Sequence, residues 1–131
     1  MDIIVDTSVL IAVLLNEPLK ANIVAATAGC SLIAPGVVPW EIGNALSAMF
    51  KRKRIELSVA QKVMSVFKSV PIRYVDVDFS RSLRLANDYS LYAYDAYFLD
   101  CAERHNVPLI SLDVRMINAA REIGIEVKEV A

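Results

Sequence analysis

Short apolar runs and longer stretches with helical periodicity alternate along the whole sequence. The short runs are rich in β-branched residues, which are typical of strands buried on both faces of a parallel sheet. They predict strands at residues 3–5, 31–34, 72–77, 109–112 and 125–130. The longer stretches predict helices at residues 9–15, 19–28, 38–52, 58–68, 79–87, 93–104 and 114–122, with Thr7 or Ser8 and Ser58 as caps and Gly29 and Gly124 as terminators.

Strands that are separated by helices need crossover connections, which make the strands parallel and put the helices on the faces of the sheet. The pattern therefore predicts an α/β fold with a mainly parallel five-stranded sheet flanked by helices on both faces. Residues 1–131 are expected to form a single domain, because no interior stretch has the composition of a linker. Ligands of such sheets bind at the carboxyl ends of the strands, so functional residues are expected there.

The composition is strongly apolar, with 56% hydrophobic and 22% charged residues. A chain with this balance fills its core and leaves apolar surface for a partner or a second copy. The longest apolar stretches are much shorter than the roughly 20 residues of a membrane span. The N-terminus lacks the features of an export signal. We therefore expect a cytoplasmic protein with no membrane association.

The net charge and the number of histidines argue against several classes of function. A net charge of −1 argues against nonspecific binding of nucleic acid through many phosphate contacts. The single histidine, His105, argues against a histidine-rich zinc centre and against a Ser-His-Asp triad. The basic run at residues 51–54 offers a local contact for phosphates, or it is a solvated helix end whose cations complement the helix dipole.

Two aspartates stand in matching places at the ends of predicted strands. Asp6 closes the first strand, and Asp113 follows the strand at residues 109–112. Because the carboxyl ends of parallel strands meet at one edge of the sheet, both carboxylates are expected at the same edge. For either residue alone, capping of the following helix is the simpler explanation.

Two further carboxylates stand in unusual places on predicted helices. Glu41 lies among apolar residues, where a carboxylate is unfavourable unless it is paired, binds a cation or reaches solvent. Asn44 follows on the same helix face and can orient Glu41 or contact a substrate. Asp95 opens a helix, where it binds an ion or serves only as a cap. The helical period turns Asp100 roughly 140° away from Asp95, so Asp100 is expected elsewhere.

Together, Asp6, Glu41, Asp95 and Asp113 have the chemistry of a site for Mg²⁺ or Mn²⁺. Hard divalent cations prefer oxygen ligands and keep some of their waters. Such an ion activates a bound water and neutralises charge that develops on a phosphate during attack. We therefore expect these four acids to be both the metal ligands and the catalytic residues.

The order of the four acids resembles that of the PIN domain, and most of all the VapC toxins of toxin–antitoxin pairs. Asp6-Thr7-Ser8 after the first strand and Tyr94-Asp95-Ala96 at the start of a late helix carry the resemblance, which extends over residues 3–130. One departure is Val114, which stands where many relatives have an acidic or polar residue.

The resemblance implies a PIN-like fold and an RNA endonuclease that depends on Mg²⁺ or Mn²⁺. It also implies a homodimer and inhibition by a VapB-type antitoxin. By position, the acidic quartet is Asp6, Glu41, Asp95 and Asp113. Thr7 or Ser8 and Ser111 would support the quartet through hydrogen bonds, with Asn44 as a further candidate.

Aromatic residues gather near the expected site. They are Trp40 and four of the tyrosines, at positions 89, 92, 94 and 97. Such side chains can stack on nucleobases, or they pack in the core or in a dimer interface.

Other functions fit this sequence less well. A phosphoaccepting signalling domain needs an acidic pair after the first strand, and a phosphatase of the Asp-x-Asp type needs a second aspartate at position 8, which is a serine here. A PIN-like binding module without catalysis and a housekeeping PIN nuclease both remain open.

Overall fold

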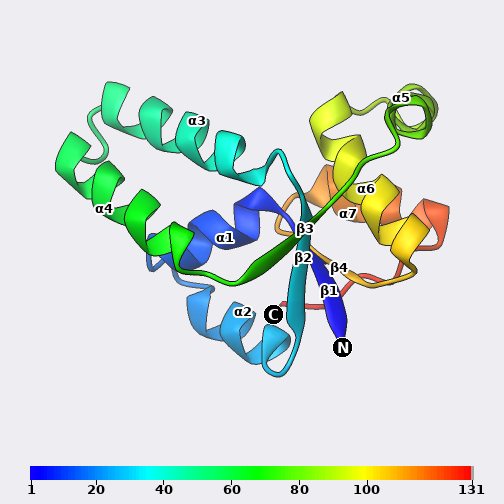
Figure 1. Cartoon of the computed structure of the whole chain (residues 1–131), viewed down its shortest axis with the longest axis horizontal. Helices are drawn as coiled ribbons and strands as arrows, with labels where there is room; N and C mark the ends of the chain where they lie inside the picture. Colours follow the sequence, from blue (N-terminus) through cyan, green and yellow to red (C-terminus); the bar gives the residue numbers. More distant parts are fainter. Residues whose placement is uncertain (131) are drawn as a thin grey trace.

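The computed structural model describes residues 1–130 of the chain and shows an α/β fold (Figure 1). The strands are β1 (Asp2–Val5), β2 (Ser31–Pro35), β3 (Ile72–Val75) and β4 (Leu109–Ile110). The helices are α1 (Thr7–Leu14), α2 (Lys20–Thr27), α3 (Val38–Lys51), α4 (Leu57–Lys68), α5 (Phe79–Asp88), α6 (Ala93–His105) and α7 (Val114–Ile123).

The four strands pair in the order β3-β2-β1-β4, and every pairing is parallel. The chain moves outward from β1 to β2 and β3, and then returns to place β4 on the other side of β1. The strand order therefore reverses beside β1, and ligands of open α/β sheets bind at such a reversal. Ile4 pairs with Leu109 and Val5 with Ile110, so the residues after β1 and β4 leave the sheet side by side.

The prediction of a fifth strand at residues 125–130 is wrong. After α7 the chain makes one isolated parallel bridge, between Val127 and Leu109. Leu109 donates its N–H to Glu126 at 2.9 Å and accepts from the N–H of Lys128 at 2.8 Å. The pairing ends there because β4 has only two residues before the chain continues to Ser111 and Asp113.

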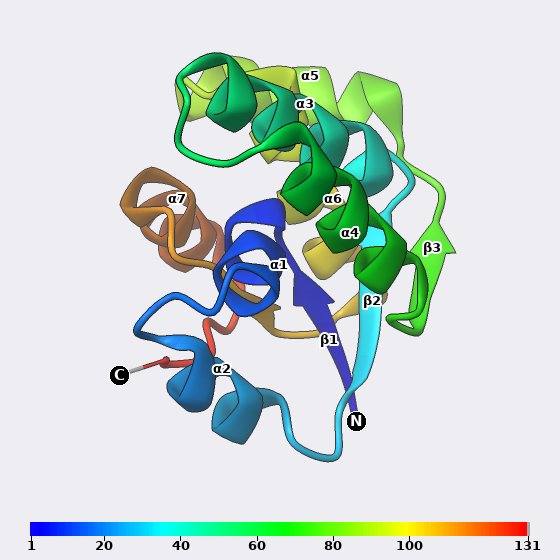
Figure 2. The same cartoon turned by 90° about the vertical axis from the view of Figure 1, so that its left-hand side faces the viewer.

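Two layers of helices cover the sheet. Helices α1 to α4 lie on one side and α5 to α7 on the other (Figure 1). Viewed from the side, α1 stands in front of β1 and α6 stands behind it (Figure 2). Among the described residues, none of the helices has the length and apolar character needed to cross a bilayer.

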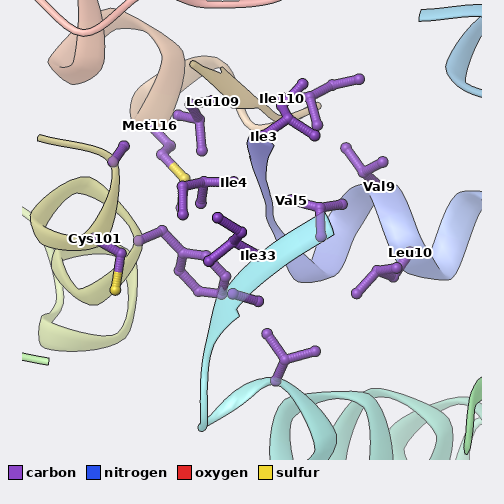
Figure 3. Packing of buried hydrophobic residues seen from close by; sticks show 14 of the residues in the cluster. Ile3, Ile4, Val5, Val9, Leu10, Ile33, Cys101, Leu109, Ile110 and Met116 are labelled. Atoms are coloured by element: carbon purple, nitrogen blue, oxygen red, sulfur yellow. The ribbon is translucent and has the colours of Figure 1, made fainter. Parts of the chain in front are cut away.

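The core lies where the central strands meet the two helical layers. The strand residues Ile3, Ile4 and Ile33 are at most 1% exposed, as expected for strands that are covered on both faces. Figure 3 shows the strand residues Ile3, Ile4, Val5, Ile33, Leu109 and Ile110 together with Val9 and Leu10 of α1, Cys101 of α6 and Met116 of α7.

Two helices begin differently from the prediction. Helix α1 is capped by Asp6, whose Oδ1 accepts the N–H of Val9 at 3.1 Å, whereas Thr7 and Ser8 lie inside the helix. An extended residue just before the helix has the geometry of a cap, and Asp6 has that backbone. Helix α4 begins at Leu57 without any side-chain cap, so the prediction that Ser58 caps it is also wrong.

Candidate active site

The N-terminal ends of four helices meet at the carboxyl edge of the sheet. Asp6 caps α1 and Asp113 caps α7, while Glu41 and Asp95 lie in the first turns of α3 and α6. Helix N-termini favour negative charge because their first N–H groups have no partner within the helix. The four carboxylates line one cavity of about 180 Å³, which Thr7, Ser8, Phe98 and Met116 complete.

Asp6 is the most deeply buried acid of the cavity, with 3% of its surface exposed. Its Oδ1 accepts the hydroxyl of Ser8 at 2.7 Å as well as the N–H of Val9 at 3.1 Å. Its Oδ2 accepts the hydroxyl of Ser111 at 2.5 Å. Three donors therefore hold this carboxylate in one orientation.

Two of these hydroxyl groups also join the end of β1 to the turn that follows β4. The Ser8 Oγ accepts the N–H of Leu112 at 3.1 Å, and the Ser111 Oγ accepts the N–H of Asp113 at 2.9 Å. Asp113 in turn accepts the N–H of Arg115 at 2.9 Å. A chain of hydrogen bonds thus runs from Asp6 to the cap of α7.

Glu41 reaches the same cavity from α3. The Thr7 hydroxyl donates to its Oε1 at 2.8 Å, across 34 residues of sequence. This hydrogen bond joins the first turns of α1 and α3 and leaves the second oxygen, Oε2, for water or an ion.

The electrostatic environment favours protonation of three of the acids. Burial raises the pKa of Asp6, and the charge of Asp113 raises it further, against the hydrogen bonds that lower it. Burial also raises the pKa of Glu41, to which the charges of Asp95 and Asp6 add. The pKa of Asp95 is raised by burial and by the charge of Asp113. Such mutual repulsion is relieved by a bound cation.

The donor set fits a hard divalent ion. Every ionisable group that lines the cavity is a carboxylate, which matches the oxygen preference of Mg²⁺ and Mn²⁺. Within residues 1–130, no three His, Cys, Asp or Glu side chains stand close enough together to hold a metal ion as they are placed. Mg²⁺ is commonly held by one or two carboxylates and keeps several waters, so it does not need three direct protein ligands.

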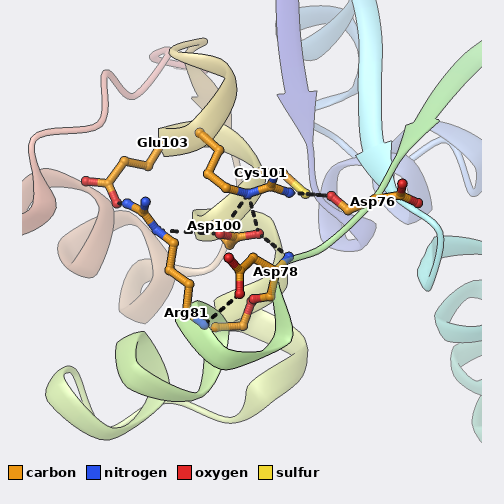
Figure 4. Close-up of polar contacts among 8 residues, drawn as sticks. Asp76, Asp78, Arg81, Asp100, Cys101 and Glu103 are labelled. Atoms are coloured by element: carbon orange, nitrogen blue, oxygen red, sulfur yellow. Dashed lines mark hydrogen bonds and ion pairs between the residues drawn. The ribbon is translucent and has the colours of Figure 1, made fainter.

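Two residues of interest lie outside the cavity. Asn44 lines a neighbouring pocket, which it shares with Thr7 and Glu41. Asp100 lies away from the cavity, as the helical period predicts; it is fully buried and pairs with Arg104 and Arg81 (Figure 4). Its Oδ2 also accepts the N–H of Asp78, which caps α5.

The sequence prediction did not include three residues that the structure places in or near the cavity. Phe98 and Met116 are the apolar residues that line the cavity. Arg115 lies close enough for its charge to lower the pKa of Asp95. Its position two residues after Asp113, in the first turn of α7, is the sequence signal that could have identified it.

The exposed aromatic residues are not part of the core. Trp40 is 78% exposed, Tyr92 76% and Tyr94 56%, so packing in the core of this chain is excluded for them. The basic run at residues 51–54 is exposed at the other end of α3. It lies about 15 Å beyond Glu41, given the rise of an α-helix.

Comparison with known proteins identifies the fold. A family model described as the PIN domain matches residues 3–122. Among curated proteins, none matches the sequence closely enough to count as a relative.

Several solved structures are similar in fold. PAE2754 from Pyrobaculum aerophilum superposes with a TM-score of 0.70 at 21% identity, covering 91% of this chain and 79% of that one. VapBC-1 from nontypeable Haemophilus influenzae gives 0.67 at 14% identity, with 98% of both chains covered. VapC20 from Mycobacterium tuberculosis, described as a toxin that cleaves the sarcin–ricin loop, gives 0.64 at 14% identity, with 97% and 99% covered.

Proposed function

Because this chain belongs to the PIN domain family, we propose that it is an endoribonuclease that uses Mg²⁺ or Mn²⁺ to cleave the phosphodiester backbone of RNA. The observation that carries the proposal is the single cavity lined by Asp6, Glu41, Asp95 and Asp113. Its place beside β1, where the strand order reverses, is where α/β sheets bind ligands.

In this proposal the four carboxylates hold the ion, directly or through its waters. A bound ion of this kind lowers the pKa of a water molecule and offsets the charge on phosphate oxygens. Asp6 is held by three donors and keeps a fixed orientation. Glu41 has one oxygen engaged by Thr7 and the other free to accept a proton from water. The N–H groups at the start of α6, which has no side-chain cap, and the nearby Arg115 favour the phosphate anion.

We further propose that the protein is a toxin of the VapC type, which acts in the cytoplasm as a homodimer and is inhibited by a VapB-type antitoxin. Several structures with this fold are described as toxin–antitoxin or VapBC complexes, which supports the proposal. The exposed apolar side chains of α4, Leu57 and Val66 among them, support a protein contact on this chain as well.

The test is cleavage of a labelled single-stranded RNA by the purified protein in MnCl₂ or MgCl₂. Cleavage is expected with either metal and should stop with EDTA. Asp95→Asn should abolish it, whereas Asp88→Asn, the same change at an exposed position on α5, should leave it intact. Cleavage that survives EDTA, or that persists in Asp95→Asn, would contradict the proposal. An absence of cleavage would favour a PIN-like binding module without catalysis.

A further inference from the structure

A second pocket adjoins the carboxylate cavity and is lined by exposed aromatic rings. It has a volume of about 490 Å³ and is lined by Trp40, Asn44 and Tyr94 together with Thr7 and Glu41. Thr7 and Glu41 also line the carboxylate cavity, and the hydrogen bond between them forms the shared wall. Whatever occupies this pocket therefore lies against the group that occupies the cavity.

Both side chains are largely exposed to solvent at the starts of helices. Trp40 lies in the first turn of α3, one residue before Glu41, and Tyr94 lies in the first turn of α6, one residue before Asp95. The Tyr94 ring packs edge-on against Tyr97, with ring centroids 5.8 Å apart and an interplanar angle of 86°. Phe79 packs in the same way on Tyr97, at 5.6 Å and 87°. Tyr94 is therefore held in place while 56% of its surface is exposed.

A nucleobase matches this pocket in three respects. A base is linked through its ribose to the neighbouring phosphate, so a base that flanks the cut bond lies close to the carboxylate cavity. Stacking on an aromatic face suits any of the bases, and the Asn44 amide can both donate to and accept from a base edge. Because the chain has a net charge of −1, contacts to phosphates supply little affinity and stacking must supply more.

We propose that Trp40 and Tyr94 form a stacking platform for an unpaired base next to the scissile phosphate. The inference rests on the proposed function and makes it more specific, because a base held in a duplex cannot expose its face to the platform. The substrate is then RNA that is single-stranded at the cleavage site.

Binding can be measured directly, because Trp40 is the only tryptophan in the sequence. The probe is a short single-stranded RNA, added in MnCl₂ to the Asp95→Asn protein so that cleavage does not interfere. Anisotropy of a labelled copy reports binding, and Trp40 emission with unlabelled RNA reports stacking. We expect the emission to be quenched by single-stranded RNA, and much less by the same sequence as a duplex or with abasic riboses.

Variants then separate stacking from other roles of the pocket. Trp40→Ala, made in the same background, should weaken binding of the RNA by about 5- to 150-fold, and Trp40→Phe should restore most of it. The loss should vanish with the abasic RNA, which has no base to stack. Tyr94→Ala should also weaken binding. Tyr92→Ala is the matched control, because Tyr92 is about as exposed as Trp40 but lies outside this pocket, and this variant should bind normally.

Each alternative gives a different result. If RNA binds without quenching Trp40, or if Trp40→Ala binds it as tightly as the parent, the platform is wrong while the nuclease proposal stands. If Trp40→Ala instead lowers the molar mass measured by light scattering and weakens intact and abasic RNA equally, the surface is a protein contact and the platform is wrong. If the wild-type protein neither binds nor cleaves RNA, the proposed function fails and the platform fails with it.

Discussion

A carboxylate buried at the end of a strand is unfavourable unless donors or a cation compensate for its lost hydration. Asp6 has three donors, whereas Asp95 relies on its position at the start of α6 and on the nearby Arg115. Glu41 has the single hydroxyl of Thr7. The acids of the cavity therefore differ in how much they need a metal ion, and substitutions can reveal the difference.

Removing charge at Asp95 or Glu41 should raise the stability of the metal-free protein. Asp95→Asn and Glu41→Gln relieve repulsion within the cavity, and the Gln oxygen can still accept from Thr7. The melting temperature in EDTA should rise by about 3–5 °C for each kcal/mol that is relieved. Asp88→Asn is the control and should have no effect. A melting temperature that is unchanged or lower in both variants would contradict the crowding of charge.

Ser111 should matter for metal binding beyond its effect on stability. Ser111→Ala removes the donor to Asp6 Oδ2 and the acceptor of the Asp113 N–H. We expect a loss of about 1–2 kcal/mol in urea denaturation. The Mn²⁺ concentration that gives half-maximal activity should rise by about 10- to 100-fold.

The matched control for Ser111→Ala is Ser82→Ala. Ser82 is also buried, and its hydroxyl bonds to the Asp78 carbonyl on α5, away from the cavity. Ser82→Ala should lose stability while keeping its Mn²⁺ dependence. An equal Mn²⁺ dependence in both variants would show that Ser111 has only a structural role.

At the scale of elements, an ionic network centred on the buried Asp100 ties α5 to α6. The fully buried Asp100 accepts from the Nε of Arg104 at 3.1 and 3.0 Å and from the N–H of Asp78 at 3.0 Å (Figure 4). Arg81 adds an ion pair to Asp100 at 3.5 Å and a second one to Glu103. Because α6 carries Asp95 in its first turn, this network fixes the helix on which the site depends.

Breaking the network should destabilise the fold substantially. Asp100→Ala removes the acceptor of the Arg104 Nε and of the Asp78 N–H as well as one ion pair of Arg81, and we expect a loss of about 2–4 kcal/mol in urea denaturation. Arg121→Ala, which breaks the exposed pair with Glu129, should change stability by about 0.5 kcal/mol or less. A similarly small effect for Asp100→Ala would mean that the network contributes little.

At the scale of the whole molecule, four helix N-termini and the ends of two adjacent strands surround one acidic cavity. Folding without a metal therefore forces negative charges together. The raised pKa values of Asp6, Glu41 and Asp95 determine the direction in which the stability of the metal-free protein changes with pH. Groups whose pKa is higher in the folded state stabilise it at low pH, and this contribution is lost as pH rises through the raised pKa values.

The stabilisation by Mn²⁺ should accordingly grow with pH. Protons and the ion compete for the same oxygens, so the rise in melting temperature on adding MnCl₂ should be small near pH 4 and larger near pH 7. The measurement is thermal unfolding with MnCl₂ or EDTA across this range. The metal-induced rise should be much smaller in Asp95→Asn. A rise that does not depend on pH, or that is equal in Asp95→Asn, would contradict binding at this cavity.

Local patterning was enough to predict the parallel α/β architecture and the positions of most elements. Runs of β-branched residues specify buried strands, and the period of 3.6 residues specifies helices, because both are properties of neighbouring residues. The same helical period predicted that Asp100 points away from Asp95. The fifth strand was a wrong prediction, because residues 125–130 have strand composition but find only two residues of β4 to pair with.

By itself, the sequence determined which acids end strands or begin helices, and therefore which edge of the sheet carries them. Only the tertiary structure decided that they share one cavity, since the contact from Thr7 to Glu41 spans 34 residues and that from Asp6 to Ser111 spans 105. It also decided which aromatic rings stay exposed and that Arg115 lies beside Asp95. These facts depend on how helices pack across the sheet, and such packing arises from many distant contacts that no local pattern records.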